Sequence, residues 1–205
     1  MTESVATGRR RLGAEQRREQ IADAAIAVVA EVGFAAATAD AVARRAGTSK
    51  GLLWHHFEDR DDMLEHAARR TLAALRSQVA ADVDLSQPVP DIVRAAVRRA
   101  VGLRSTHRAQ LNGLREIASQ LRRPDGSLRL GPEDYEETYA GQEALFRRGQ
   151  VDGDLDPDLA PRMMAVAYQG AVDALLAYLD AHPDLDAQQC ADETSAVLLR
   201  GMLAR

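Results

Sequence analysis

Apolar residues recur at intervals of three or four positions along most of the chain. In the segment 14–32 they include Ile21, Ala25, Val28 and Val32, and the same interval returns in several later segments. This spacing puts the apolar side chains on one face of a helix. No run of alternating β-branched residues indicates a strand. The pattern therefore predicts an all-α fold with about nine helices.

Turn-forming and capping residues divide this pattern into segments. Gly33, Gly47, Pro88 and Pro90 interrupt it, as does the stretch 123–132 with two prolines and two glycines. Such residues end helices or form turns, because glycine adopts left-handed backbone angles and proline lacks an N–H. We predict helices at residues 14–32, 39–46, 50–56, 60–79, 90–103, 106–122, 133–150, 158–181 and 187–202.

The segment 38–57 predicts two short helices joined by a tight turn. Thr38 has the hydroxyl of an N-cap, Gly47 suits the left-handed end of a helix, and Thr48 or Ser49 suits the cap of the next one. Leu53 gives the second helix an apolar inner side. This is the pattern of a helix-turn-helix, whose second helix lies in the major groove of DNA.

The charge of the chain suits such a role only weakly. The net charge is -5, and residues 1–60 hold nine Lys and Arg against eight Asp and Glu, or +1. Long-range attraction to phosphate is therefore weak, and binding has to depend on local contacts and two-fold avidity. Lys50, at the start of the second helix, is the one lysine in the chain, against 25 arginines.

Other chemistry finds little support in the residues. A single cysteine, Cys190, excludes an intrachain disulfide and a multi-cysteine zinc site; it is read as a small helix residue, with a redox role as the alternative. The chain has no nucleophile elbow, no phosphate-binding glycine loop and no His-x-x-x-His pair. We expect no catalysis, no metal and no cofactor. Without a signal peptide or an apolar run of ~20 residues, a cytoplasmic location is expected.

Three regions follow from these patterns. Residues 1–13, with Arg9, Arg10 and Arg11, predict a disordered basic arm, which either reaches DNA or is a solvated charge run. Residues 14–60 predict a three-helix head that contains the helix-turn-helix. Residues 61–205 predict a helical body.

The head resembles a known family. The run AVARRAG at 41–47, then SKG at 49–51, then Leu53, Trp54, His56 and Phe57, is similar to the TetR family of ligand-responsive transcriptional regulators. The resemblance implies a homodimer that binds a pseudo-palindromic DNA operator, with repression as the expected sign, and a small-molecule effector that releases it. The alternative is a helical protein that binds a partner or metabolite, with a head that is only a non-specific DNA tether.

Residue by residue, the resemblance implies DNA contacts in and just after the helix-turn-helix. Leu52 stands where members of the family frequently have Thr, and it leaves an apolar surface suited to a thymine methyl. Trp54 stands where the family usually has Tyr. Which of two adjacent histidines faces DNA stays open. The candidate DNA-binding residues are Thr38, Thr48, Ser49, Lys50, Gly51, Leu52, Trp54, His55, His56 and Arg60.

The resemblance also implies an effector pocket between the central helices of the body. Each candidate has an alternative role in core packing or in an interface between copies. The candidates are Leu103, His107, Leu111, Leu114, Tyr135, Tyr139, Phe146, Tyr168, Gln169 and Asp173.

The last two predicted helices carry wide apolar stripes. The other body helices are too few to cover both an inner and an outer face, so these helices are expected to meet a second copy in a four-helix interface. The candidate interface residues are Val172, Leu175, Leu176, Leu179, Thr194, Val197, Leu198 and Met202.

Overall fold

The computed structural model describes residues 13–81 and 84–204, and within them the fold is all-α, as predicted. The predicted basic arm, residues 1–13, lies outside the described residues except for Gly13. The helices are α1 (Ala14–Val32), α2 (Ala39–Arg45), α3 (Lys50–His56), α4 (Arg60–Ala80), α5 (Val89–Thr106), α6 (Arg108–Gln120), a 3-10 turn η1 (Pro132–Tyr135), α7 (Glu136–Val151), α8 (Pro161–Ala181) and α9 (Ala187–Arg200).

Local capping explains where α2 and α3 begin. The Thr38 hydroxyl accepts a hydrogen bond from the Ala41 amide at 3.3 Å, and the Ser49 hydroxyl accepts one from the Leu52 amide at 3.1 Å. Gly47 between the helices has φ 62°, which glycine adopts without steric cost. Of the two candidate caps for the second helix, Ser49 is therefore the one that acts.

A capping exchange also fixes the start of α4. The Asp59 carboxylate accepts from the Asp62 amide at 2.8 Å. The Asp62 carboxylate in turn accepts from the Glu58 amide at 3.0 Å, one residue before the position that a standard capping box uses. The direction in which α4 leaves the head is thus set by two acidic side chains at its first turn.

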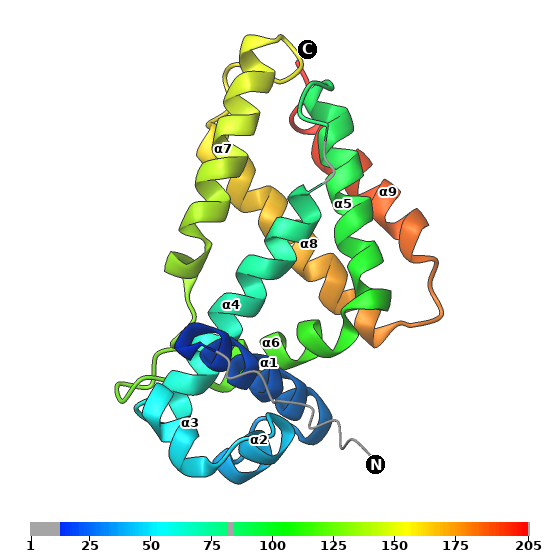
Figure 1. Ribbon diagram of the computed structural model, residues 1–205. Helices are drawn as coiled ribbons and strands as arrows, with labels where there is room; N and C mark the ends of the chain where they lie inside the picture. Colours follow the sequence, from blue (N-terminus) through cyan, green and yellow to red (C-terminus); the bar gives the residue numbers. More distant parts are fainter. Residues whose placement is uncertain (1–12, 82–83, 205) are drawn as a thin grey trace, which may run out of the picture.

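The head and part of the body share one hydrophobic core. Leu53 and Phe57 pack with the inner face of α1, and the same cluster includes Met63 and Leu64 of α4 and Ile117 of α6. The core of the head thus continues past the boundary expected at residue 60. In Figure 1, α6 lies beside α1, where the three-helix head meets the rest of the chain.

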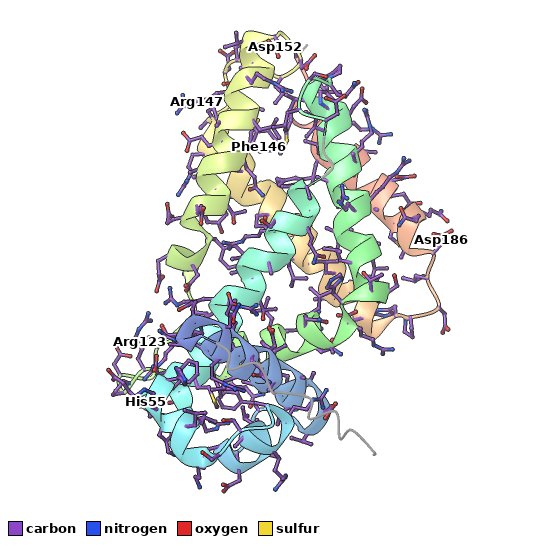
Figure 2. All side chains as sticks on the ribbon, in the orientation of Figure 1. His55, Arg123, Phe146, Arg147, Asp152 and Asp186 are labelled. Carbon is purple, nitrogen blue, oxygen red and sulfur yellow. The ribbon has the colours of Figure 1, made fainter. Side chains whose placement is uncertain are left out.

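A second core lies between α5, α7, α8 and α9. Phe146 points from α7 into this region (Figure 2), and its ring meets that of Tyr168 edge to face at 5.9 Å between centroids. Asp180 on α8 ties this core to α6, because it accepts hydrogen bonds from Arg104 of α5 and Arg115 of α6. Within residues 13–81 and 84–204, each helix is too short or too polar to span a lipid bilayer.

The second core corrects the predicted interface. Val172, Leu175, Leu179 and Met202 are buried within the single chain, so most of their apolar surface is already covered before any second copy is added. A stripe of apolar residues in a sequence does not tell which of two faces points inward. Among the other candidates, Val197 is 69% exposed, and Leu176, Thr194 and Leu198 are half-buried. Met163, which is not one of the candidates, is 59% exposed.

Several predicted boundaries also move: α5 ends at 106 instead of 103, α6 spans 108–120 instead of 106–122, α8 begins at 161 instead of 158, and α9 ends at 200 instead of 202. The helix expected at 133–150 is divided into η1 and α7, and α5 begins at Val89, one residue before the expected start. Pro90 and Pro132 both lie in the first turn of their helices, where the missing N–H of proline costs no hydrogen bond. Proline therefore marks the starts of these helices within one residue.

Candidate nucleic-acid interface

The short helix α3 has one inner and one outer side. Leu53 is fully buried and Phe57 is buried, whereas Leu52 and Trp54 are each 38% exposed. Apolar side chains of this size that remain exposed on one helix form a surface suited to base edges and thymine methyl groups. The outer side of α3, together with the exposed Gly51, is the first part of the candidate interface.

The two N-caps bring polar groups to the edge of the same surface. Thr38 and Ser49 are exposed, and each stands at the start of a helix whose first amides carry partial positive charge. These helices are short, so the caps act as neighbours of α3 and not as anion sites in their own right. Lys50 follows Ser49, and its ammonium lies 3.0 Å from a carboxylate oxygen of Asp40 on α2.

The adjacent histidines separate into an outer and an inner one. His55 is exposed on α3 (Figure 2), whereas His56 is half-buried and meets the His55 ring edge to face at 5.4 Å. The pKa of His56 is lowered by burial first, and then by the positive charges of His55, Arg17 and Arg18. His55 is thus the histidine on the outer side, and a neutral His56 is favoured.

Two predicted contact residues have other roles in the fold. The Thr48 hydroxyl is buried with no hydrogen-bond partner among the described residues, so it cannot reach a phosphate. Arg60 donates from Nε to the Ala37 carbonyl at 3.0 Å and from Nη2 to the Phe34 carbonyl, and its guanidinium lies over the Phe34 ring at 4.5 Å. Arg60 therefore braces the loop before α2, and we leave both residues out of the candidate interface.

The buried Thr48 hydroxyl gives a stability prediction. Thr48→Val keeps the shape of the side chain and removes an unpaired buried hydroxyl, so it should raise the free energy of unfolding by about 1 kcal/mol. Thr38→Val removes a working N-cap and should lower it by about 1 kcal/mol. Denaturant unfolding of both variants measures the two shifts. A loss of stability in Thr48→Val would mean that its hydroxyl does have a partner.

In the body, four of the predicted pocket residues come together between α4, α7 and α8. The rings of Tyr135 and Tyr139 stack with centroids 5.9 Å apart, and Gln169 donates to Asp173 at 2.9 Å. Arg76 of α4, which sequence reasoning missed, lies over the Tyr135 ring at 4.9 Å and donates to the Asp134 carbonyl at 2.9 Å. This set is called the body polar cluster below.

Burial shifts the pKa values of two side chains in the body polar cluster. It raises the pKa of Tyr135 to about 12. It also raises the pKa of Asp173, more than the bond from Gln169 and the charge of Arg76 lower it, although part of the Asp173 surface is open to solvent. Gln142, also missed, donates to Gln169 at 2.8 Å and extends the chain of hydrogen bonds to α7. A lone Arg on the apolar face of α4 is the one sequence signal that points to this cluster.

The other predicted pocket residues lie elsewhere. Phe146 and Tyr168 belong to the second core, and burial raises the pKa of Tyr168 to about 12. Leu114 packs against the core of the head. Leu103, His107 and Leu111 are half-buried along α5 and α6, where the His107 ring contacts the Thr106 hydroxyl at 2.8 Å. The predicted pocket is therefore not one set of residues. Tyr135, Tyr139, Gln169 and Asp173 lie in the body polar cluster, and Phe146 and Tyr168 meet in the second core.

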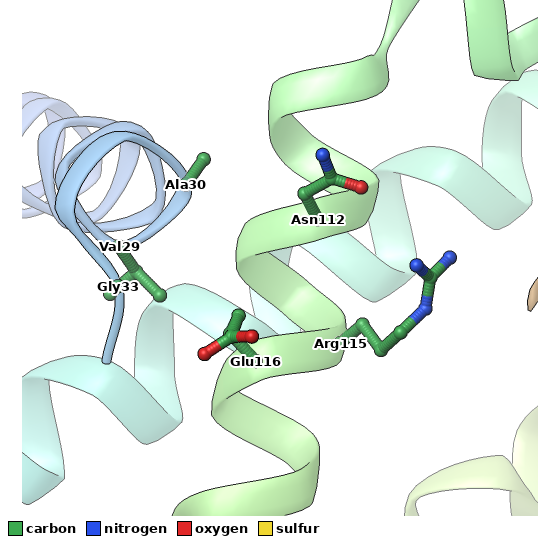
Figure 3. A pocket seen from close by; sticks show the side chains of 6 residues that line it. All are labelled: Val29, Ala30, Gly33, Asn112, Arg115 and Glu116. Atoms are coloured by element: carbon green, nitrogen blue, oxygen red, sulfur yellow. The ribbon is translucent and has the colours of Figure 1, made fainter. Parts of the chain in front are cut away.

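Two concave regions occur at other places. A cleft of ≈ 210 Å³ lies between the end of α1 and α6, and Figure 3 shows Asn112, Arg115 and Glu116 along its α6 side. A groove of ≈ 380 Å³ runs between α8 and α9, and Met163 and Val197 line it. Among the described residues, no group of three or more His, Cys, Asp or Glu is arranged to hold a metal ion.

Sequence comparison finds relatives of the head. Residues 21–67 match the family model described as "Bacterial regulatory proteins, tetR family". The HTH-type transcriptional regulator BetI of Serratia proteamaculans is 43% identical over 63 residues, which is 31% of this chain and 32% of that protein. BetI of Cronobacter sakazakii is 42% identical over 65 residues, 32% of each chain. The match spans about a third of the length of these relatives.

Structure comparison covers nearly the whole chain. A TetR-family transcription regulator from Shewanella sp. PV-4, described as putative, has a TM-score of 0.73 at 18% identity, over 92% of this chain and 99% of that one. The fatty acid degradation regulator FadR from Bacillus halodurans has a TM-score of 0.74 at 17% identity, over 93% and 97%. At these identities the likeness concerns the fold.

Proposed function

From the match of residues 21–67 to the tetR family model, we propose that the chain is a DNA-binding transcriptional regulator of that family. In this proposal it acts as a homodimeric repressor on a pseudo-palindromic operator in the bacterial cytoplasm, and a small-molecule effector releases it. The observation that carries the proposal is the outer side of α3, where Lys50, Leu52, Trp54 and His55 are exposed together over a buried Leu53.

The proposed readout follows from the chemistry of that surface. Leu52 and Trp54 offer apolar contact to thymine methyl groups, and Lys50 offers hydrogen bonds to guanine. Gly51 lets the backbone come close to DNA, and the N-caps Thr38 and Ser49 stand where phosphates would flank α3. Because the head carries little net charge, a single head would bind weakly, and two heads on one duplex would gain by avidity.

The proposed dimer uses the outer face of α8 and α9. Met163, Val166 and Val197 are exposed there, and a groove lined by Leu159 and Ala167 runs between the helices. Exposed apolar side chains gathered beside a groove favour contact with another protein surface. Since both helices belong to one chain, a two-fold copy would complete a four-helix interface.

The proposed effector site is the body polar cluster. Arg76, Tyr135 and Asp173 come from three different elements, so a molecule bound among them would change how α4 packs against η1 and α8. Because α4 also carries part of the core of the head, such a change would reach the helix-turn-helix. The identity of the effector is left open by these contacts.

The proposal is tested by Lys50→Ala together with selection of bound sites from random DNA. Loss of a base contact should weaken binding to the enriched site about 10-fold to 100-fold, since such contacts contribute about 1–3 kcal/mol. Binding to random duplex should change much less. Fluorescence anisotropy with labelled duplexes measures both affinities.

A matched control separates base contact from bulk charge. Arg147→Ala removes one positive charge from the exposed surface of α7 and should leave both affinities nearly unchanged. If no sequence is enriched, or if the wild-type protein binds enriched and random duplexes equally, the second candidate function holds: the head is a non-specific tether for a partner- or metabolite-binding body.

A further inference from the structure

Lys50 is held by a residue that the DNA-binding pattern does not include. Its ammonium lies 3.0 Å from Oδ2 of Asp40, and both side chains are exposed, 52% and 61%. Asp40 belongs to the first turn of α2, whereas Lys50 is the first residue of α3. The contact therefore joins the two helices of the helix-turn-helix on their outer side.

We propose that Asp40 is a specificity-determining residue, which directs the Lys50 ammonium toward base edges and restrains it from reaching phosphates. This inference rests on the proposed DNA-reading function. Lys50 carries the one Lys or Arg charge of α3, so its direction decides where that charge acts.

Helix electrostatics favour Asp40 and disfavour Lys50 at their positions. A carboxylate in the first turn of α2 is stabilised by the helix dipole, but a cation at the first residue of α3 faces the positive end of its own helix. Without Asp40, the Lys50 side chain would turn outward on its flexible stem. With Asp40, the ammonium is drawn across the turn between α2 and α3.

The restraint leaves part of the ammonium free. Lysine has three N–H donors, and the bond to Asp40 uses one of them. The remaining two match the pair of acceptors, O6 and N7, that guanine presents in the major groove. Lys50 is therefore able to contact a base while it stays bonded to Asp40.

A phosphate contact is affected differently. Non-specific affinity comes almost wholly from cations that reach phosphates, and a free lysine reaches them in many directions. To do so, Lys50 would leave Asp40 and bring an unpaired carboxylate near the DNA backbone. Asp40 thus weakens non-specific binding to phosphates more than it weakens specific binding to base edges. The ratio of specific to non-specific DNA affinity therefore rises.

Two other cations of the head are also held by groups of the fold. Arg45 pairs with Glu31 of α1 at 2.5 Å, and Arg60 is held by two backbone carbonyls. The pair of Arg45 and Glu31 joins α1 to α2 without a residue of α3, and it is exposed like the pair of Lys50 and Asp40. It therefore supplies a matched control that changes the charge of the head by the same amount.

The test compares Asp40→Asn with Glu31→Gln. Affinities for the enriched site and for random duplex are measured over a range of salt concentrations. In Asp40→Asn, binding to random duplex should tighten about 5-fold to 10-fold and its salt slope should steepen by about 0.9, equal to one added phosphate contact. Binding to the enriched site should change less than about 2-fold, because the base contact of Lys50 is kept. Glu31→Gln should shift both affinities equally.

A double-mutant cycle assigns the effect to Lys50. In the Lys50→Ala background, Asp40→Asn should leave the ratio of the two affinities unchanged. The inference is overturned if Asp40→Asn has the same ratio of enriched-site affinity to random-duplex affinity as the wild-type protein. It is also overturned if Glu31→Gln lowers this ratio as much as Asp40→Asn does. Asp40→Ser gives a second variant in case Asn disturbs α2, and thermal melts check that each one folds. A wild-type protein without any sequence preference would instead contradict the proposed function itself.

Discussion

Gly113→Ala should lower the free energy of unfolding by about 2 kcal/mol. A Cβ atom at Gly113 would lie 2.6 Å from the carbonyl oxygen of Ile26 and 3.3 Å from its carbonyl carbon, and backbone atoms cannot rotate away as a side chain does. Overpacking of this kind costs up to about 3 kcal/mol, and the better helix propensity of alanine returns about 1 kcal/mol. For a chain of this size the midpoint of thermal unfolding should fall by about 4–8 °C.

The control is the same substitution in another helix. A Cβ at Gly141 in α7 meets nothing within 4 Å, so Gly141→Ala should raise the free energy of unfolding by about 0.5–1 kcal/mol. Denaturant unfolding of both variants measures whether each change in the free energy of unfolding is a loss or a gain. If Gly113→Ala were as stable as the wild-type protein, α1 and α6 would have to separate without loss, and the close approach would not be a requirement of the fold.

Gly113 also lies where the head meets the body. α6 touches α1 at this glycine, and Arg115, two residues later, bonds to Asp180 on α8. A change in the body that moves α8 would therefore pull on the helix that packs against the head. We expect Gly113→Ala to alter how strongly an effector changes DNA affinity, beyond its effect on stability.

The segments that sequence predicts well are those fixed by local chemistry. Thr38, Gly47 and Asp59 set helix ends through contacts with residues at most a few positions away. Such contacts can be predicted from the sequence, because the capping side chain and the amide it binds are close along the chain. The start of α5 is predicted within one residue for a similar reason, since Pro90 fits the first turn.

The features that sequence does not predict depend on contacts across the fold. Gly113 and Gly141 look alike in the sequence, and they differ only in whether another backbone lies opposite. Val172 and Val197 are both apolar helix residues, but the first is covered by the same chain and the second is not. The direction of an apolar face is a property of the whole packing arrangement, which periodicity alone does not contain.

The candidate DNA surface contains, within a few residues, features that local sequence predicts and features that depend on contacts across the fold. The alternation that buries Leu53 and exposes Leu52 and Trp54 follows from helix geometry, so the sequence predicts it. The pairing of Lys50 with Asp40 spans ten positions and the turn between two helices, so no local pattern marks it. Thr48 is a candidate DNA contact by the resemblance, but the turn directs its hydroxyl inward.

Val197→Glu should convert the proposed dimer to monomers and reduce operator affinity by about 100-fold or more. Val197 is 69% exposed on α9 and lines the groove between α8 and α9. A carboxylate from each copy in an apolar two-fold seam would be desolvated without a partner, which costs several kcal/mol. The loss of avidity then leaves each weakly charged head to bind alone. Sedimentation velocity measures the oligomeric state, and anisotropy measures the affinity.

Val151→Glu is the matched control, because Val151 is 86% exposed at the end of α7 and is absent from the lining of the groove. It should change neither the mass nor the affinity. Leu175→Arg, which the sequence pattern suggests for the same purpose, should instead unfold the body, since Leu175 is buried in the second core. If the Val197→Glu protein remained dimeric, the dimer interface would have to lie on another face of the protein. A monomer that still binds the operator at full strength would show that one head is sufficient. Avidity would then not be what compensates for the net charge of only +1 on residues 1–60.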